Sequence, residues 1–484
     1  MNDFINRQQE LWFLNEQYNS TASSMVVLYG RRRMGKTSLI REFVKDKPFV
    51  FFLATEESPL ENMREFAKQI NLNDYHPQPL PFDNTLDTDD ADWELLFQTL
   101  AERIPDQRLV LVLDGFQYLG KTDPSFPSLF QRIWDKHLQH ENIMVILCGS
   151  VIHMMDAQTL SANSPLYGRR TGQLMLRDID FRYYHEFFDG LSYKELIEHY
   201  AVTGGVPFYI EVFSKKTTTR AESGSHKRSY LLAKIGRHIL SKQGFLFEEP
   251  YGLLKNETTD PGACFSILKS VATGNNRIGE ISNDLQMKQG LLPKHIKTLI
   301  DLDILEYVVP ITETNPEKSK LAYYRIKDNF LLFWFRFVYP EKTRLELGDM
   351  TPVLQHIKKY FAPHHMVSVY KSVCQSEMWL LARQGHLSFT KLGPWWDKNE
   401  EIDLVALDSV GDEIVFAECR YQTKPMDVDV FDRLLYKKSL VDWKNDSRHE
   451  RFVLFSISGF TKQLQDLVAG HEDVILFSLP FENQ

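Results

Sequence analysis

Residues 25–38, MVVLYGRRRMGKTS, decide the fold of this chain. The run MVVLY is short, apolar and rich in β-branched residues, so it predicts a buried strand. After it come a glycine, four residues and then Gly-Lys-Thr, which is the spacing of a P-loop between a strand and a helix. In such a loop successive backbone N–H groups surround phosphate oxygens, the lysine reaches the β and γ phosphates, and the threonine hydroxyl is offered to Mg²⁺. We therefore expect ATP and Mg²⁺ as cofactors, bound by Gly30, Arg31, Arg32, Arg33, Met34, Gly35, Lys36, Thr37 and Ser38.

Three further apolar runs lie within the first 150 residues: FVFFLA (49–54), LVLVL (109–113) and IMVILCG (143–149). Short apolar runs that alternate with longer amphipathic stretches are typical of a parallel sheet whose strands are connected by helices. We therefore predict an α/β fold, with a P-loop NTPase sheet over residues 1–175.

The run LVLVL leads into Asp114, which is expected to serve the Mg²⁺ of a bound nucleotide together with Thr37. Many hydrolytic P-loop proteins place a second acid at the next position. Here that position is Gly115. The sequence thus predicts the metal ligands of the site but leaves the activation of water without its usual residue.

Three other segments supply candidates for the same site. Ser150, in LCGSV, is a candidate for contact with the γ-phosphate or the attacking water, with helix capping as its alternative role. In SPLYGRR, Arg169 or Arg170 is a candidate arginine finger from the same chain or from a neighbouring molecule, with simple solvation as the alternative. In GGVPFY, Pro207 and Tyr209 are expected against the adenine, unless the segment only breaks a helix.

The size and composition indicate several domains of an ordinary globular protein. A chain of 484 residues exceeds what one core normally supports, and its apolar and charged fractions are 43% and 25%. The net charge of -9 argues against a surface that binds nucleic acid everywhere. With no metal-ligand spacing among the cysteines and no apolar segment long enough to span a bilayer, we expect free thiols and a cytoplasmic protein. The cysteines are Cys148, Cys264, Cys374 and Cys419.

The middle of the chain contains two segments with different sequence patterns. Residues 176–250 are predicted to be a helical lid on the nucleotide domain. Over residues 255–345, three short amphipathic segments followed by EYVVPIT and LAYYRI predict three helices and a hairpin, the pattern of a winged helix. The third helix, LPKHIKTLI, is basic enough to contact DNA phosphates and apolar enough to pack against a nucleotide domain. Its basic residues, with the lysine just before it, are Lys288, Lys294, His295 and Lys297.

The motifs also occur in the order of a known family. GRRRMGKT, LDGFQYL, CGS, LYGRR and GGVPFY resemble successive motifs of the archaeal and bacterial P-loop ATPases of the STAND class, relatives of AAA+ proteins, over residues 1 to about 340. FINRQQEL resembles the family's Phe-x-Gly-Arg-Glu-x-Glu-Leu box near the nucleotide base. It retains Phe4, Arg7, Glu10 and Leu11. The resemblance implies a nucleotide contact for Arg7 and a regulatory clamp for the winged helix.

One departure from this family bears on activity. The family usually has Asp-Glu-Phe-Gln where this chain has Asp114-Gly115-Phe116-Gln117. Glycine has no side chain that can act as a general base, although Gln117 is a candidate for orienting water. Phosphate and metal binding do not depend on Gly115. We therefore expect slow turnover and a long-lived ATP state.

The last 120 or so residues resemble a PD-(D/E)XK nuclease core. Glu377 in SEMWLL, Asp403 in EEIDLVAL, and Glu418 and Arg420 in EIVFAECRY follow the order of that core. The resemblance implies that Asp403 and Glu418 hold Mg²⁺ and that a lysine assists the attacking water. Arg420 stands at the lysine position and keeps its proton, so we expect little cleavage. Acids on solvated strand faces are the alternative interpretation.

Together these features predict an ATP-dependent switch in which nucleotide state sets a winged-helix clamp and the clamp controls a nuclease-like domain over residues 346–484. One alternative is a DNA-binding regulator whose winged helix reads DNA and whose last domain is catalytically inactive. Another is an active magnesium-dependent DNase. The expected partners are ATP, DNA under the two alternatives, and further copies of the chain in a nucleotide-dependent manner. No membrane contact is expected.

Overall fold

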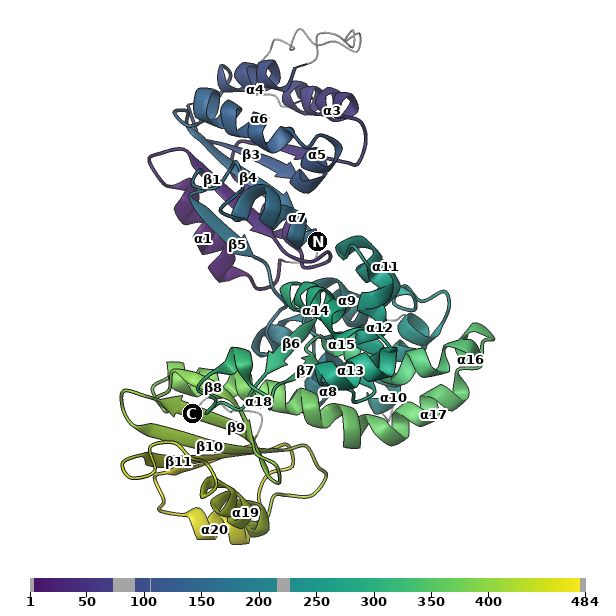
Figure 1. The fold of residues 1–484 in the computed structure, drawn as a ribbon, viewed down its shortest axis with the longest axis vertical. Coiled ribbons are helices and arrows are strands. Elements are labelled where there is room, and N and C mark those ends of the chain that lie inside the picture. Colours follow the sequence, from purple (N-terminus) through teal and green to yellow (C-terminus); the bar gives the residue numbers. More distant parts are fainter. Residues whose placement is uncertain (1–3, 73–91, 105, 216–226, 479–484) are drawn as a thin grey trace. The chain divides into compact units, whose positions relative to one another are not determined.

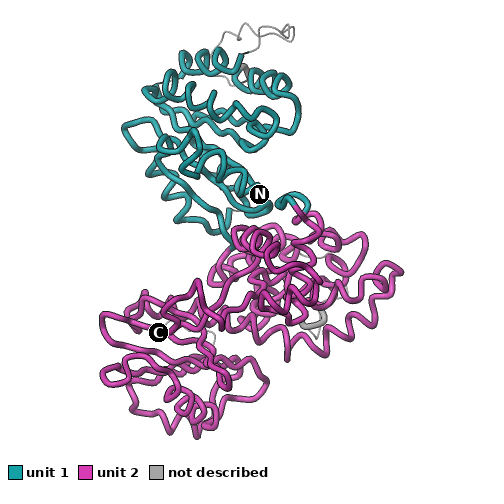
Figure 2. The backbone as a smooth tube through the Cα atoms, in the orientation of Figure 1, with its two compact units in different colours: residues 1–178, 255–259 teal, residues 179–254, 260–484 magenta. Residues whose placement is uncertain are grey.

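The computed structural model describes residues 4–72, 92–104, 106–215 and 227–478 (Figure 1). The chain divides into two compact units, which are coloured separately in Figure 2. The first unit comprises residues 1–178 and 255–259, and the second comprises residues 179–254 and 260–484. The short segment 255–259 is therefore separated in sequence from the rest of the unit in which it lies.

The first unit is built on a parallel sheet with the strand order β2-β3-β4-β1-β5. The four predicted apolar runs form β1 to β4, so the predicted α/β P-loop fold is confirmed. The fifth strand was not predicted, because its residues, GQLM, are few and only partly buried. The strands are β1 (Ser24–Tyr29), β2 (Phe49–Leu53), β3 (Leu109–Asp114), β4 (Ile143–Gly149) and β5 (Gly172–Met175).

Helices lie on both sides of this sheet, as Figure 1 shows. They are α1 (Gln8–Tyr18), α2 (Lys36–Val44), α3 (Pro59–Leu72), α4 (Trp93–Ala101), α5 (Phe116–Thr122), α6 (Phe126–Ile133) and α7 (Ile152–Met155). The P-loop connects β1 to α2. The turn after β3 carries Gly115 and leads into α5.

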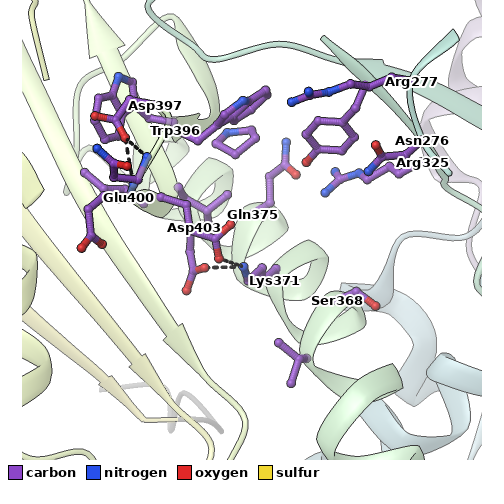
Figure 3. A pocket seen from close by; sticks show the side chains of 18 of the residues that line it. Asn276, Arg277, Arg325, Ser368, Lys371, Gln375, Trp396, Asp397, Glu400 and Asp403 are labelled. Carbon is purple, nitrogen blue, oxygen red and sulfur yellow. Dashed lines mark hydrogen bonds and ion pairs between the residues drawn. The ribbon is translucent and has the colours of Figure 1, made fainter. Parts of the chain in front are cut away.

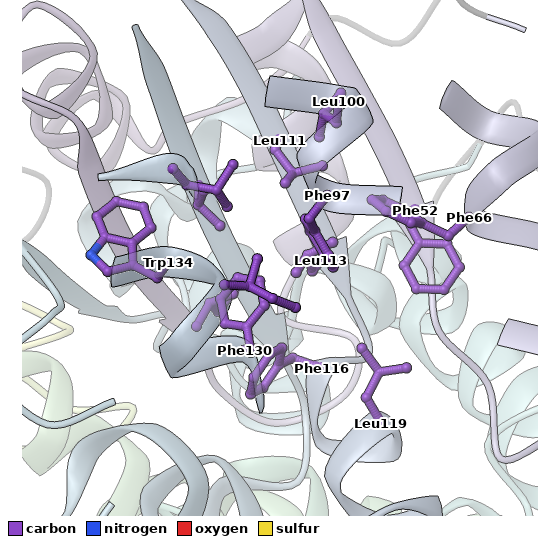
Figure 4. Packing of buried hydrophobic residues seen from close by; sticks show 14 of the residues in the cluster. Phe52, Phe66, Phe97, Leu100, Leu111, Leu113, Phe116, Leu119, Phe130 and Trp134 are labelled. Atoms are coloured by element: carbon purple, nitrogen blue, oxygen red, sulfur yellow. The ribbon is translucent and has the colours of Figure 1, made fainter. Parts of the chain in front are cut away.

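An aromatic core holds β2 and β3 against the helices on one face of the sheet (Figure 4). Phe66 of α3 lies 4.8 Å from Phe97 of α4 between ring centroids, and Trp93 lies 5.1 Å from Phe126 of α6. Burying each of these side chains stabilises the fold by roughly 2–3 kcal/mol. The end of β3, where Asp114 lies, is thereby fixed to a rigid layer.

The second unit begins with helices and a small hairpin. Three helices and a two-stranded antiparallel hairpin form within residues 261–326, where three helices and a hairpin were predicted; we call this the helix-hairpin segment. The elements up to the hairpin are α8 (Tyr193–Thr203), α9 (Pro207–Ser214), α10 (Lys227–Ile235), α11 (Glu249–Glu257), α12 (Pro261–Ala272), α13 (Ile278–Leu285), α14 (Leu292–Asp301), β6 (Leu305–Val308) and β7 (Tyr323–Ile326). They are followed by α15 (Asn329–Phe333), α16 (Lys342–Glu346), α17 (Thr351–Tyr360) and α18 (Met366–Arg383).

The chain ends in a mixed sheet with the order β12-β11-β10-β9-β8. Here β8 and β9, and β9 and β10, pair antiparallel, whereas β10, β11 and β12 run parallel. The elements are β8 (Lys391–Trp396), β9 (Glu401–Asp408), β10 (Glu413–Arg420), α19 (Val428–Lys438), β11 (His449–Ser456), α20 (Lys462–Val468) and β12 (Val474–Ser478). Within the described ranges, none of the helices in either unit has the length and apolar character needed to cross a membrane.

Candidate functional site

The P-loop has a backbone that favours anions. Arg33 and Gly35 both adopt positive φ angles, 72° and 82°. Left-handed residues within a turn allow successive N–H groups to form a concave anion site. Gly30 also requires glycine, since a Cβ atom there would lie 2.5 Å from the carbonyl oxygen of Leu176. Lys36 begins α2 and is buried, and its Nζ donates to the carbonyl oxygens of Gly30 at 2.7 Å and Arg31 at 2.9 Å. Burial lowers the pKa of Lys36.

The arginines that follow Gly30 have separate partners. Arg31 is buried and pairs with Asp178 at 3.2 Å, which ties the start of the loop to the chain beyond β5. Arg32 donates from Nη2 to the hydroxyl of Tyr118 on α5 at 2.6 Å. The backbone N–H of Arg32 donates to Oε1 of Glu257 at 3.0 Å, so a carboxylate from the segment 255–259 reaches the loop.

Arg7 holds the N-terminal segment against the P-loop. It is buried, pairs with Glu10 at 2.9 Å, and donates to the carbonyl oxygen of Met34 at 3.4 Å and to that of Arg177 at 2.5 Å. A nucleotide contact for Arg7 stays a prediction, but its contact with the P-loop is direct.

Thr37 and Asp114, the two residues predicted to serve Mg²⁺, lie beside each other. The Thr37 hydroxyl donates to Oδ2 of Asp114 at 3.1 Å, across β4, which lies between β1 and β3. A hydroxyl and a carboxylate are oxygen ligands of the kind that Mg²⁺ takes, and Lys36 lies at the start of the same helix. The residues present therefore fit a nucleotide with its Mg²⁺, which would supply charge neutralisation between the phosphates.

Position 115 has no side chain, and the backbone conformation and neighbouring atoms also leave no space for one. Its φ angle is 80°, and its N–H donates to the carbonyl oxygen of Cys148 at 2.9 Å. A Cβ atom at this position would lie 2.6 Å from the carbonyl oxygen of Ala54, closer than real contacts allow. Any acid at this position would need a different turn after β3.

Ser150 and Gln117 lie close to the same edge of the sheet. Ser150 directly follows β4, whose residue Cys148 pairs in register with Asp114 on one side and with Leu28 on the other. Gln117 is buried on α5, and a Cβ atom on Gly149 would lie 2.3 Å from its Oε1. That oxygen has no hydrogen-bond partner among the described residues. The amide is thus directed at the end of β4, beside Ser150.

The two candidate finger arginines are held by other groups. Arg169 makes two bonds to the carboxylate of Asp135, at 3.2 and 3.0 Å. Arg170 donates to the carbonyl oxygens of Thr159 and Leu160 and lies over the ring of Tyr167. An arginine finger from either residue stays a prediction, and each would first have to leave these partners.

Pro207 is the first residue of α9, where proline is well tolerated because its missing N–H is not needed there. Tyr209 donates to Oε1 of Glu249 at 2.7 Å within the second unit. The predicted adenine contacts of Pro207 and Tyr209 stay predictions.

The predicted acids of the C-terminal sheet pair with cations, and Figure 3 shows the pair of Asp403 with Lys371. Asp403 on β9 pairs with Lys371 of α18 at 2.5 Å, and its Oδ2 accepts from the N–H of Cys419 at 2.8 Å. Glu418 on β10 pairs with Lys437 of α19 at 2.5 Å and with Arg420 at 3.2 Å. Asp403 and Lys371 line a pocket of about 870 Å³ that also contains Trp396, whose ring packs on Tyr323 at 5.1 Å.

This arrangement does not fit a cation. Each of the two carboxylates already has a lysine within hydrogen-bond distance of an oxygen. In the ranges that the structure describes, no group of three or more histidine, cysteine, aspartate or glutamate side chains is placed to hold a metal ion. Glu377, on the helix of Lys371, accepts from Tyr193 at 3.2 Å instead. We therefore derive no chemistry through Mg²⁺ at Asp403 and Glu418.

The helix-hairpin segment presents a basic groove of about 850 Å³ between α14 and the hairpin. Lys297 of α14 and Lys318 and Lys320 of the hairpin loop line it and are exposed. His295 differs from the other predicted cations, because it is largely buried and its Nε2 lies 3.9 Å from Asp260. Lys288 and Lys294 are exposed.

Sequence reasoning did not find Glu257, Lys371 or Lys437. Each meets its partner through the fold rather than through a motif, and Glu257 lies more than 200 positions beyond Arg32 in the chain. A single sequence carries no local signal for such pairs.

Comparisons with known proteins agree with the geometry of the first unit. A family model of ATPase domains that occur predominantly in Archaea matches residues 4–213. The protein MJECL04 of Methanocaldococcus jannaschii is 33% identical over 481 residues, which cover 98% of this chain and 99% of that protein. The chain belongs to this archaeal ATPase family. A second model, for archaeal and bacterial proteins of unknown function, matches residues 334–430.

Two further similarities are more limited. The ATP-binding protein MJ0423 of the same organism is 48% identical over 44 residues, covering 9% of this chain and 75% of that protein. The Walker-type ATPase PABY2304 of Pyrococcus abyssi is 20% identical, with a TM-score of 0.52, over 69% of this chain and 96% of that structure. The second similarity shows that the fold is that of a P-loop ATPase.

Proposed function

We propose that this P-loop ATPase is a nucleotide switch that binds ATP with Mg²⁺ and hydrolyses it slowly. The loop from Gly30 to Lys36 would hold the phosphates, and Thr37 with Asp114 would serve the metal. Ser150 and the buried amide of Gln117 lie at the same edge of the sheet and are candidates for contact with the γ-phosphate or its water.

The turn at Gly115 carries this proposal. A general base must lie within hydrogen-bond reach of the attacking water, and removing such a group typically lowers a rate by roughly 10²–10⁴-fold. At Gly115 a side chain is missing, and the 2.6 Å approach of Ala54 leaves no room for one. Nothing in that turn weakens the contacts made by Lys36, Thr37 and Asp114. Binding without rapid turnover follows.

The nucleotide site is tested with Lys36→Ala. Loss of a charge-assisted phosphate contact costs about 2 kcal/mol, which corresponds to roughly thirtyfold weaker ATP binding. Lys45→Ala is the matched control, since Lys45 is an exposed lysine just beyond α2. Calorimetry with ATP and Mg²⁺ compares the three proteins. Equal affinity for the wild type and Lys36→Ala would refute the assignment of the site.

We propose that the output of the switch is the C-terminal mixed sheet, a nuclease-like domain without magnesium-dependent cleavage, and that the helix-hairpin segment is a winged helix acting as a regulatory clamp. Support comes from the cation pairs at Asp403 and Glu418, which use the oxygens that a metal would need. Under this proposal Arg169 or Arg170 would act as an arginine finger, on the site of the same chain or of a neighbouring copy, and Pro207 would touch the adenine.

A second candidate function is DNA binding by the winged helix. The exposed cations of the basic groove favour it, because carboxylates of the described residues form no ion pair with Lys297, Lys318 or Lys320 and such cations suit phosphates. A mobility shift with the full chain and a double substitution, Lys297→Glu with Lys318→Glu, tests it. Binding that the double substitution abolishes supports a DNA-binding regulator. Equal or absent binding supports the clamp.

A further inference from the structure

Glu257 is the last residue of α11, and it lies in the first unit although this helix begins in the second. Its side chain is completely buried. Burial of a carboxylate destabilises a protein unless hydrogen bonds or cations compensate its charge, so compensating groups are expected around Glu257. They belong to the P-loop.

One oxygen of Glu257 is bound by the loop itself. Oε1 accepts from the backbone N–H of Arg32 at 3.0 Å, within the segment between Gly30 and Lys36 that supplies N–H groups to phosphates. Oε2 is buried and has no hydrogen-bond partner among the described residues. The carboxylate is thus held by one bond where a phosphate group, with three acceptor oxygens and a higher charge, would make several.

Charge points to the same position. Burial lowers the pKa of Lys36, and the negative charges of Glu257 and Asp114 oppose this lowering. Burial raises the pKa of Glu257, against the hydrogen bond from Arg32 and the positive charges of Lys36, Arg32 and Arg31. Two negative groups, a carboxylate and a γ-phosphate, would repel each other in this cradle.

We propose that Glu257 is an internal competitor for the phosphate site, which lies against the P-loop in the absence of nucleotide and is displaced, together with residues 255–259, when ATP binds. This inference rests on the proposed binding of ATP. It also gives the switch a mechanical connection, because α11 continues back to Glu249, which accepts a hydrogen bond from Tyr209 of GGVPFY in the second unit. Displacement of Glu257 at one end of α11 would therefore shift Glu249 at the other end.

The full-length Glu257→Gln variant tests the proposal. Glutamine keeps an acceptor for the Arg32 N–H but removes the charge, so we expect the non-hydrolysable analogue AMP-PNP to bind about tenfold more tightly than to the wild type. Glu248→Gln is the matched control, because Glu248 is an exposed neighbour that pairs with Lys342, and it should leave affinity unchanged. Unchanged affinity of Glu257→Gln, with a lower rate of ATP hydrolysis, would overturn the proposal and make Glu257 the general base.

Hydrogen exchange provides a second measurement that needs no variant. Amides of residues 249–259 should exchange faster when AMP-PNP is added to the wild type, because the segment is released. Slower or unchanged exchange in a protein that binds AMP-PNP would overturn the competitor while leaving the nucleotide site intact. Binding of AMP-PNP by Glu257→Gln but not by the wild type would support most strongly the proposal that Glu257 competes for the phosphate site. Absence of binding by both proteins would refute the nucleotide site and the competitor with it.

Discussion

The carbonyl oxygen of Ala54 lies 2.6 Å from the position that a Cβ atom would take on Gly115. The contact is set by the sheet, since the N–H of Ala54 donates to the carbonyl oxygen of Asp114 at 2.7 Å and thereby prolongs the pairing of β2 with β3. The residue after Asp114 is thus constrained from a neighbouring strand. The shape of the turn therefore excludes the acid that usually follows this aspartate.

Substitution of Gly115 should therefore not create a fast ATPase. We expect Gly115→Glu and Gly115→Ala to lower stability by a similar amount, about 1–3 kcal/mol, because both force a side chain into a left-handed backbone against Ala54. ATP hydrolysis by Gly115→Glu should exceed that of Gly115→Ala only slightly. Thermal unfolding and steady-state hydrolysis of the pair separate strain from chemistry. A stable Gly115→Glu with a rate raised by roughly 10²-fold or more would show that the turn accepts a base.

The C-terminal domain should not cleave DNA with Mg²⁺. Lys371 and Lys437 already neutralise Asp403 and Glu418, so replacing Arg420 by lysine adds no missing group. A plasmid-nicking assay should find no magnesium-dependent cleavage by the wild type or by Arg420→Lys, with and without ATP. Asp403→Ala is the control for contaminating nucleases. Strong wild-type cleavage that Asp403→Ala removes would favour the active DNase instead.

Stability should fall in mild acid because of buried histidines. Burial lowers the pKa of His365 to about 3 and that of His199 to about 4, while Nε2 of His365 lies 2.6 Å from the carbonyl oxygen of Ala201. The unfolded chain takes up protons below about pH 6.5 and the folded chain does not, so each histidine costs up to about 1.4 kcal/mol per pH unit as the pH falls toward its folded value.

Denaturant unfolding between pH 7 and pH 4 checks this expectation. His365→Gln keeps a donor for the Ala201 carbonyl and cannot be protonated, so its stability should decline less steeply than that of the wild type. His386→Gln changes an exposed histidine and should follow the wild type. Identical slopes for the wild type and His365→Gln would contradict a neutral buried imidazole.

The sequence predicted the elements that depend on local pattern. The four apolar runs are β1 to β4 to within one residue at each end, because a parallel strand buried on both faces is a continuous apolar run. The helices and the hairpin within residues 261–326 also form as predicted. The sequence could also predict that Lys36, Thr37 and Asp114 lie at one site, because a P-loop has a fixed spacing and Asp114 ends a strand; Thr37 and Asp114 lie 3.1 Å apart.

What the sequence could not predict depends on contacts between distant segments. Arg420 lies 3.2 Å from Glu418 and 4.0 Å from Asp403, beside both predicted acids. The sequence did not predict that Lys371 from α18 would pair with Asp403 or Lys437 from α19 with Glu418. Glu257 reaches Arg32 only because the end of α11 returns to the first unit. Side-chain partners of this kind follow from packing, which local patterns do not encode.

The chemical state of the bound nucleotide tests directly whether the protein holds ATP without rapid hydrolysis. Wild-type protein is mixed with Mg²⁺ and ATP labelled at the α-phosphate, and unbound nucleotide is removed by rapid filtration. The bound nucleotide is then identified as ATP or ADP over time. We expect most of the bound nucleotide to be still ATP after about a minute, with turnover far below the typical enzyme rate of about 10 s⁻¹. Conversion of nearly all bound ATP to ADP within about a second, or steady turnover near that typical rate, would contradict this expectation.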